Sequence, residues 1–170
     1  MPAAETPVTR SGARKPSVAA GAASGTPLSL TVPGQAGQVK AARAFIARVA
    51  AMHGLCDEIA CLLGSEVVTN ALQHSFSRQP GGVITITATV TTGLVLVEVT
   101  DDGGLSEPVF REAEAEDTYA EGGRGLRLVD ELSADWGYYH HDDRLVTWFE
   151  IEAEPLPALP DGTRLISDEH

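Results

Sequence analysis

The sequence predicts an α+β domain, a two-layer α/β sandwich in which helices cover one face of a mixed, mostly antiparallel sheet. Strand-like and helix-like segments follow one another in the order β-α-α-β-β-loop-α-β-β. The later strands come in hairpin pairs, and the alternating βαβ units of a dinucleotide-binding fold are absent. Hydrophobic residues make up 43% of the 170 residues, which is enough for one packed core.

The first half of this domain is expected to contain one strand and two helices. Residues 28–32 alternate apolar and polar side chains, as a half-buried strand does. Apolar residues at helical spacing predict a helix over 36–53, with Gly54 as its C-cap, and a second helix over 56–76.

The second half is expected to add two hairpins, one helix and a long acidic loop. The first pair of strand segments is rich in β-branched residues, and a turn at Thr92-Gly93 joins it. The expected elements are strands at 83–90, 94–100, 134–140 and 145–151, a loop at 105–121 and a helix at 126–132.

The amino-acid composition indicates where the domain begins and ends and which classes of partner are excluded. We expect a disordered N-terminal tail over 1–26, the domain over 27–152 and a loose tail over 153–170. The formal net charge of −12 argues against nucleic acid and anionic membranes as partners. No apolar run is long enough to span a bilayer, and the two cysteines show no disulfide or metal-site spacing, so a cytoplasmic protein is expected.

A polar stripe runs along the second predicted helix. Glu66, Asn70 and His74 are spaced four residues apart, so on a helix their side chains stack on one face. Glu can accept a proton, and the Asn side-chain oxygen can bind a hard cation such as Mg²⁺. The same spacing also describes the solvated face of an ordinary amphipathic helix, so the stripe alone leaves both interpretations open.

Asp101-Asp102-Gly103-Gly104 follows directly after a predicted strand. An Asp at a strand end can accept a hydrogen bond from an exocyclic amine, and glycine lets the backbone approach a planar ring. Because Asp-Gly is also a common turn dipeptide, a plain turn is the alternative.

Gly122-Gly123-Arg124-Gly125 stands at the start of the third predicted helix. Free N–H groups and the positive end of the helix dipole form an anion site there, and Arg124 can add a charge-assisted contact. A flexible hinge before the helix is the alternative. Taken in this order, a metal ligand and base, an adenine acceptor and a phosphate-binding turn describe an ATP site.

These motifs resemble the GHKL superfamily of ATP-binding domains with the Bergerat fold, and are most similar to its small bacterial anti-sigma-factor serine/threonine kinases. SEVVTNALQH resembles the N-box, DDGG the first glycine box and GGRGLRLV the second. WGYYHHDDRLVTWFEIE resembles the closing hairpin. The similarity covers about residues 28–152.

The resemblance implies a role for each matching residue. Asn70 would bind Mg²⁺, and Glu66 would be the general base that activates a serine, threonine or water nucleophile. Asp101 would take the adenine amino group, since its spacing to Gly103 favours it over Asp102, and 105–121 would be the lid. The implied ATP-binding set is Asn70, His74, Asp101, Gly103, Gly123, Arg124, Gly125 and Leu126.

Two function hypotheses follow from the resemblance. The first is a serine/threonine kinase that transfers the ATP γ-phosphate to a partner regulator, such as an anti-anti-sigma-like protein, and that also holds a sigma factor. The second is an ATP-binding interaction switch without phosphotransfer, which the turn 142–144 favours because relatives often carry glycine there. A structural domain without nucleotide is a third interpretation, and the sequence leaves a homodimer open.

Overall fold

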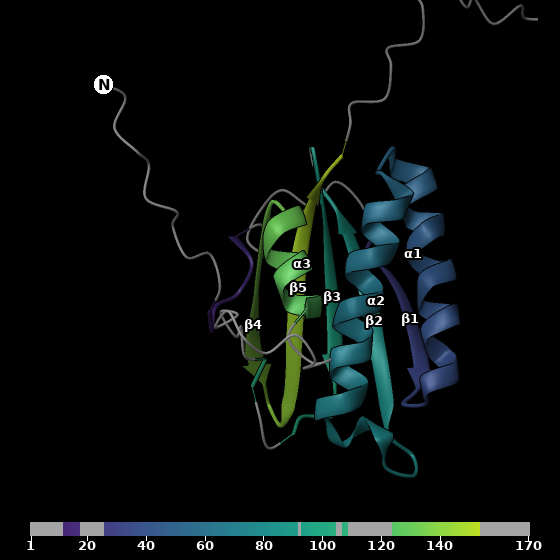
Figure 1. Ribbon diagram of the computed structural model, residues 1–170, viewed down its shortest axis with the longest axis vertical. Helices are drawn as coiled ribbons and strands as arrows, with labels where there is room; N and C mark the ends of the chain where they lie inside the picture. Colours follow the sequence, from purple (N-terminus) through teal and green to yellow (C-terminus); the bar gives the residue numbers. More distant parts are fainter. Residues whose placement is uncertain (1–11, 18–25, 92, 105–106, 109–123, 154–170) are drawn as a thin grey trace, which may run out of the picture.

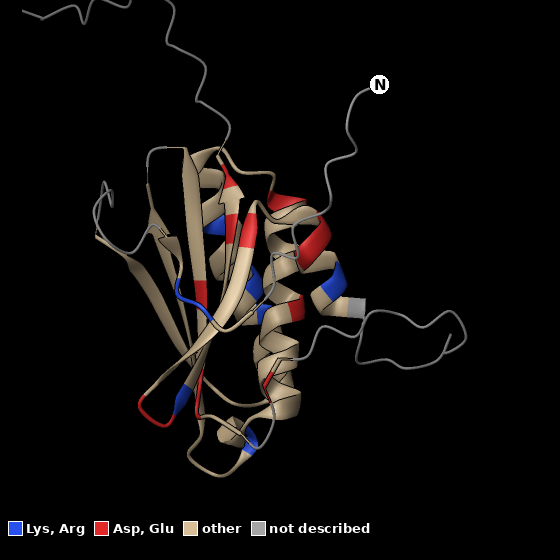
Figure 2. Ribbon diagram, turned by 90° about the vertical axis from the view of Figure 1, so that its left-hand side faces the viewer, with Lys and Arg blue, Asp and Glu red and all other residues tan. Residues whose placement is uncertain are grey.

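The computed structural model describes residues 12–17, 26–91, 93–104, 107–108 and 124–153. One five-stranded sheet forms the first layer, and the helices of the described part lie together on one of its faces (Figure 1). The view along the sheet in Figure 2 shows the two layers side by side. The predicted α+β sandwich is confirmed.

Every pairing in the sheet is antiparallel, in the spatial order β1-β2-β3-β5-β4. Both predicted hairpins are present, and the second one inserts β5 between β3 and β4. The strands are β1 Leu28–Pro33, β2 Val83–Val90, β3 Leu94–Asp101, β4 Asp135–His141 and β5 Arg144–Glu152.

The helices begin and end close to the predicted positions. Asp57 and Glu58 in the first turn of α2 favour its start, because acidic side chains interact well with the positive end of the helix dipole. Gly54 ends α1 in the left-handed conformation, with φ 66°, as predicted. The α-helices are α1 Val39–His53, α2 Asp57–His74 and α3 Arg124–Leu132, and short 3-10 turns flank them at Ala36–Gln38 and Phe76–Arg78.

The core lies between α2 and the helix-side face of the sheet. A Cβ at Gly64 would overlap the Ile46 side chain, so this glycine allows α1 and α2 to pack closely. Trp136 is 1% exposed and donates its indole N–H to Asp130 at 2.8 Å, which ties β4 to α3. Fully buried members of the core include Leu63, Val67, Val68, Ile84, Ile86, Val95, Val97, Val99, Val129 and Phe149.

The opposite, outer face of the sheet is polar over β1 and β2. Thr31 and Thr85 hydrogen-bond across these strands at 2.9 Å, and Ser29 lies 3.4 Å from Thr87. This agrees with the alternation of threonines in the sequence. Helices leave this face uncovered (Figure 2).

The structure differs from the predicted disordered tail at residues 12–17, which lie beside β4 and are purple in Figure 1. Ala13 forms a parallel bridge with Tyr138, and Pro16 is buried. Composition missed this segment because the contacts that hold it come largely from its backbone and two basic side chains. Residues 1–11 and 18–25 of the predicted tail, the loop 105–121 except 107–108, and 154–170 lie outside the described residues.

Within the described part of the chain, no helix has both the length and the apolar character that crossing a bilayer requires.

Candidate functional site

Glu66 contacts the start of α3. A Cβ added at Gly125 would overlap the Glu66 carboxylate and would lie 3.3 Å from the Glu66 Cβ. Gly125 is therefore glycine because α2 and α3 meet here, and the carboxylate lies at the N-terminal turn of α3. Backbone N–H groups in the first turn of a helix have no partner within the helix, so this is where an anion would bind.

Asp101 is the last residue of β3 and belongs to the same row of inward-facing side chains as Val97 and Val99. It is 3% exposed, and its Oδ1 accepts a hydrogen bond from the Gly103 N–H at 2.8 Å. Burial raises the pKa of Asp101 to about 6, the Gly103 hydrogen bond opposes this rise, and the neighbouring Asp102 adds to it. A buried acceptor at a strand end suits an amine donor from a ligand.

Asp102, by contrast, makes structural contacts within the sheet and the turns beside it. Its Oδ2 accepts the Val83 N–H at 2.8 Å, and its own N–H donates to the Ser77 hydroxyl at 2.9 Å. Arg144 lies 3.7 Å from its other carboxylate oxygen. These contacts hold the start of β2 in place, and Asp101 is the carboxylate of this pair that faces the helix layer. The contact of Asp101 with adenine stays a prediction.

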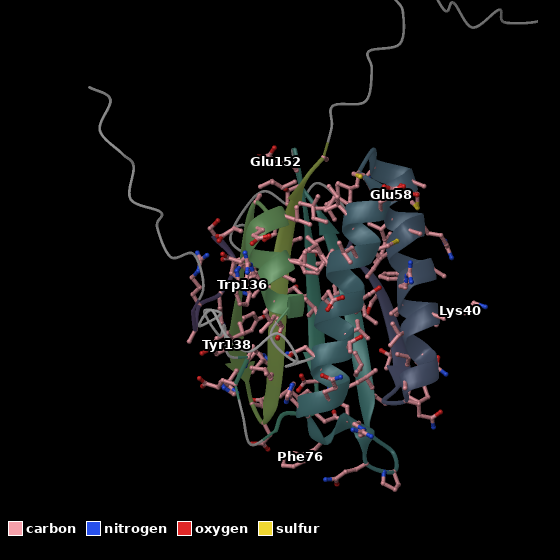
Figure 3. All side chains as sticks on the ribbon, in the orientation of Figure 1. Lys40, Glu58, Phe76, Trp136, Tyr138 and Glu152 are labelled. Carbon is pink, nitrogen blue, oxygen red and sulfur yellow. The ribbon has the colours of Figure 1, made fainter. Side chains whose placement is uncertain are left out.

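The turn after β3 is joined to the end of α2. The Phe76 N–H donates to the Gly103 carbonyl at 2.6 Å, and a Cβ at Gly104 would overlap the His74 carbonyl. Gly103 has φ 70°, and a Cβ there would overlap the Asp143 carbonyl, so its backbone conformation and its surroundings both require glycine. Figure 3 shows Phe76 at the lower end of α2.

Asn70 lies between these two junctions, one helical turn from Glu66 and one from His74. It is half-buried, and within the described part of the chain its carboxamide has no hydrogen bond. No three His, Cys, Asp or Glu side chains among the described residues gather closely enough to hold a metal ion. A single carboxamide oxygen is compatible with Mg²⁺, because Mg²⁺ keeps several waters and binds substrate phosphates.

The remaining predicted site residues are not all brought to this point. His74 is exposed, and the Leu126 side chain is 4% exposed within the core, so only its backbone could reach a ligand. Arg124 begins α3, and its side chain lies outside the description. Gly123 falls outside the described residues.

A match to the family described as "Histidine kinase-like ATPase domain" spans residues 32–151, most of the chain. This chain belongs to that family. It is a GHKL-type ATPase domain, as the motifs indicated, and such a domain implies ATP binding.

Two similar proteins place the domain in larger chains. "Blue-light-activated histidine kinase 2" of Erythrobacter litoralis is 44% identical over 73 residues, which are 42% of this chain and 19% of that protein. The crystal structure of the RsbU and RsbW domains of Rv1364c from Mycobacterium tuberculosis matches with a TM-score of 0.53 and 19% identity, over 77% of this chain and 34% of that one. The chain thus spans only a fraction of each, and the second match supports the fold.

The GHKL domain brings one further residue to the site that the sequence analysis missed. Thr147 on β5 pairs with Val99, two residues before Asp101 on β3, and is 3% exposed on the helix-side face. Within the described part of the chain its hydroxyl has no hydrogen bond. The sequence shows Thr147 as a polar residue within the apolar run of β5, which could have marked it as a candidate site residue. Its position beside Asp101, however, depends on the pairing of β5 with β3.

Polar side chains of β4 form a second missed group. The Tyr138 hydroxyl donates to Glu107 Oε2 at 2.8 Å, and His140 Nε2 lies 3.4 Å from Glu107 Oε1. A charge on His140 lowers the pKa of Asp101, so this cluster borders the strand-end carboxylate. It links the segment just after the glycine turn to β4.

The turn that departs from the family pattern keeps a glycine-like backbone. Asp142 has φ 54°, a left-handed conformation that Asp tolerates better than most residues. The turn also places the Asp143 carbonyl against Gly103. This side of the GHKL domain therefore retains the turn geometry without the glycine.

Proposed function

We propose that this chain is a regulatory serine/threonine protein kinase that transfers the γ-phosphate of ATP to a hydroxyl of a partner protein. The observation that carries the proposal is the contact between Glu66 and Gly125. It puts a carboxylate, which can accept a proton, at the helix start where the terminal phosphate of a nucleotide would bind.

The residues present fit ATP and Mg²⁺. Asp101, buried at the strand end, would accept the adenine amino group, and Gly103 keeps the backbone beside it clear of a side chain. Asn70 would hold Mg²⁺, which when bound would neutralise phosphate charge. Arg124 and Gly125 would face the phosphates through the first turn of α3. Gly123, which precedes them in the sequence, His74 and the Leu126 backbone complete the proposed set.

In the proposed reaction Glu66 takes the proton from a serine or threonine hydroxyl. The hydroxyl oxygen then bonds to the γ-phosphorus, the bond to the β–γ bridging oxygen breaks, and ADP leaves. Phosphoryl transfer depends mainly on alignment and charge neutralisation, so one base, one cation and a set of helix N–H groups suffice.

The partner is proposed from the resemblance to anti-sigma-factor kinases, and the RsbW domain in the similar structure supports it. We propose a sigma factor or an anti-anti-sigma-like regulator as the protein that this chain holds or phosphorylates. A cytoplasmic location and a homodimer belong to the same proposal.

Thermal unfolding with and without Mg-ATP tests the nucleotide part. Mg-ATP should raise the midpoint of the wild type and of Gln73→Ala, an exposed neighbour on α2, but not that of Asn70→Ala. An unchanged wild-type midpoint at millimolar Mg-ATP would contradict both ATP hypotheses.

Transfer of label from γ-labelled ATP to co-purified or candidate partners tests the chemistry. Glu66→Gln should keep ATP binding and lose transfer, whereas Glu58→Gln, exposed in the first turn of the same helix, should keep both. If wild type binds ATP and labels no partner, phosphotransfer is refuted and the interaction switch replaces it.

A further inference from the structure

The backbone of segment 12–17 forms a parallel bridge with the free edge of β4. The Arg14 N–H donates to the Tyr138 carbonyl at 2.7 Å, and the Tyr138 N–H donates to the Gly12 carbonyl at 3.3 Å. Figure 1 shows this segment beside β4, at the edge of the sheet opposite β1. Addition of an extended segment to an exposed sheet edge is a common way in which domains bind peptides.

Arg14 anchors the segment on the outer face. Its guanidinium lies over the Trp148 ring, 5.3 Å from the centroid, and pairs with the Asp135 carboxylate. It also donates to the Trp136 carbonyl at 3.2 Å, and the Trp148 indole N–H donates to the Arg14 carbonyl at 2.7 Å. One arginine thus combines a stacked ring, an ion pair and backbone contacts, which Lys cannot reproduce with a point charge.

The charges beneath this anchor require a cation. Asp135 and Glu150 are cross-strand neighbours on β4 and β5, so their carboxylates share the outer face. Glu150 is 4% exposed, and among the described residues its Oε1 has no hydrogen-bond partner. Burial raises the pKa of Glu150, Asp135 raises it further, and Arg14 opposes both. Without a cation here, two adjacent carboxylates would be left uncompensated.

Two more contacts shape the site around an extended chain. Lys15 lies 5.3 Å from the centroid of the Tyr139 ring. A Cβ at Gly137 would come within 3.0 Å of the Trp148 ring and 3.1 Å of the Gly12 carbonyl, so this glycine leaves room for the segment. The surface fits a Gly-x-Arg-Lys-Pro sequence in particular.

We propose that the β4 edge, with Trp148, Asp135 and Tyr139, is a peptide-binding site for an extended basic segment centred on an arginine, and that segment 12–17 is its resident, exchangeable occupant. An external partner would present the same chemistry, an arginine in an extended strand followed by a second basic residue. The site is independent of the ATP site, since it lies on the outer face of the sheet.

Because segment 12–17 is part of the same chain, it would block the site against external peptides. A segment covalently attached to its site competes at an effective concentration in the millimolar range. The hydrogen bonds described between the two backbones involve a single residue of β4, Tyr138, so the side chains of Arg14 and Lys15 are expected to provide most of the binding. A substitution of Arg14 that weakens the binding of segment 12–17 should therefore expose the site to a peptide in solution.

The test uses the full chain and a fluorescein-labelled peptide with the sequence of residues 11–17, Ser-Gly-Ala-Arg-Lys-Pro-Ser. Fluorescence anisotropy should show at least tenfold tighter binding to Arg14→Glu than to wild type or to Arg48→Glu, an exposed arginine on α1. A peptide with Ala in place of the arginine should bind at least tenfold more weakly. Equal binding to all three proteins, equal binding of both peptides, or no binding to Arg14→Glu would overturn the proposal.

Hydrogen exchange of the Trp148 indole N–H gives a second measurement. It can be made on wild type and on a milder variant, so it tests the proposal even if Arg14→Glu does not fold. In wild type the NMR signal of this N–H should exchange slowly with deuterium, because it donates to the Arg14 carbonyl. In Arg14→Glu, or in the milder Arg14→Gln, exchange should be at least tenfold faster and should slow again when the peptide is added. Rapid exchange in wild type, or exchange that the peptide leaves unchanged in both variants, would refute the site.

Discussion

Replacing Asp101 by Asn tests whether this carboxylate, proposed to bind a ligand, lowers the free energy of unfolding of the protein. Asp101 is 3% exposed, and burial raises its pKa from 3.8 to about 6. Between these pH values the folded protein holds a proton that the unfolded chain has lost, so stability falls as pH rises through this window and stays lower above it. A shift of this size corresponds to about 3 kcal/mol.

We therefore expect Asp101→Asn to raise the free energy of unfolding at pH 7 by about 1–3 kcal/mol, since the amide keeps an acceptor for the Gly103 N–H but must bury its own N–H₂. Urea denaturation measures the change. At pH 5 the gain should fall to roughly half, because wild-type Asp101 is then mostly protonated in the folded state.

Asp102→Asn is the matched control. Its carboxylate accepts the Val83 N–H and faces Arg144, so this variant should lose stability. An Asp101→Asn variant less stable than wild type at both pH values would refute the reasoning. Asp101→Asn should also bind ATP at least tenfold more weakly than wild type in a fluorescent-nucleotide displacement assay. An affinity equal to that of wild type would contradict the adenine role of Asp101.

Three further substitutions probe the packing of the site. Gly103→Ala should lower the free energy of unfolding by about 2–4 kcal/mol in urea, because φ is 70° and the methyl group would overlap the Asp143 carbonyl. Gly125→Ala should cost about 1–3 kcal/mol and reduce phosphotransfer more than ATP affinity, since its methyl group displaces Glu66; unchanged transfer would argue against the base. Thr147→Val should change stability by less than about 1 kcal/mol but weaken ATP binding several-fold by titration, and unaltered affinity would remove Thr147 from the site.

Local patterns were sufficient for the elements of this fold. Helical spacing of apolar residues placed α1 and α2 within a few residues of their ends, and Gly54 marked the end of α1. The β-branched runs predicted the first hairpin. Asp101 was proposed as a site residue because it ends a strand and stands two residues before a glycine, a relation that local sequence contains.

What the sequence could not reveal depends on long-range pairing. Thr147 lies near Asp101 only because β5 inserts between β3 and β4, and no local pattern specifies which strands pair. The contact of Gly125 with Glu66 requires the crossing of two helices 59 positions apart in the sequence. Segment 12–17 was missed for a related reason, since Trp148, which covers it, stands 134 positions from Arg14.

The hydrogen bond from the Phe76 N–H to the Gly103 carbonyl fixes α2 and the turn after β3 relative to each other through backbone atoms. The corner that carries Asn70 and Asp101 is thus held in place by backbone atoms, and a purine bound there, as we propose, would lose little of its binding free energy to ordering of the protein. On this proposal, adenosine without phosphates should bind without rearranging the corner. A difference in shape between ATP-bound and ADP-bound protein is then expected at α3, where the terminal phosphate is proposed to lie.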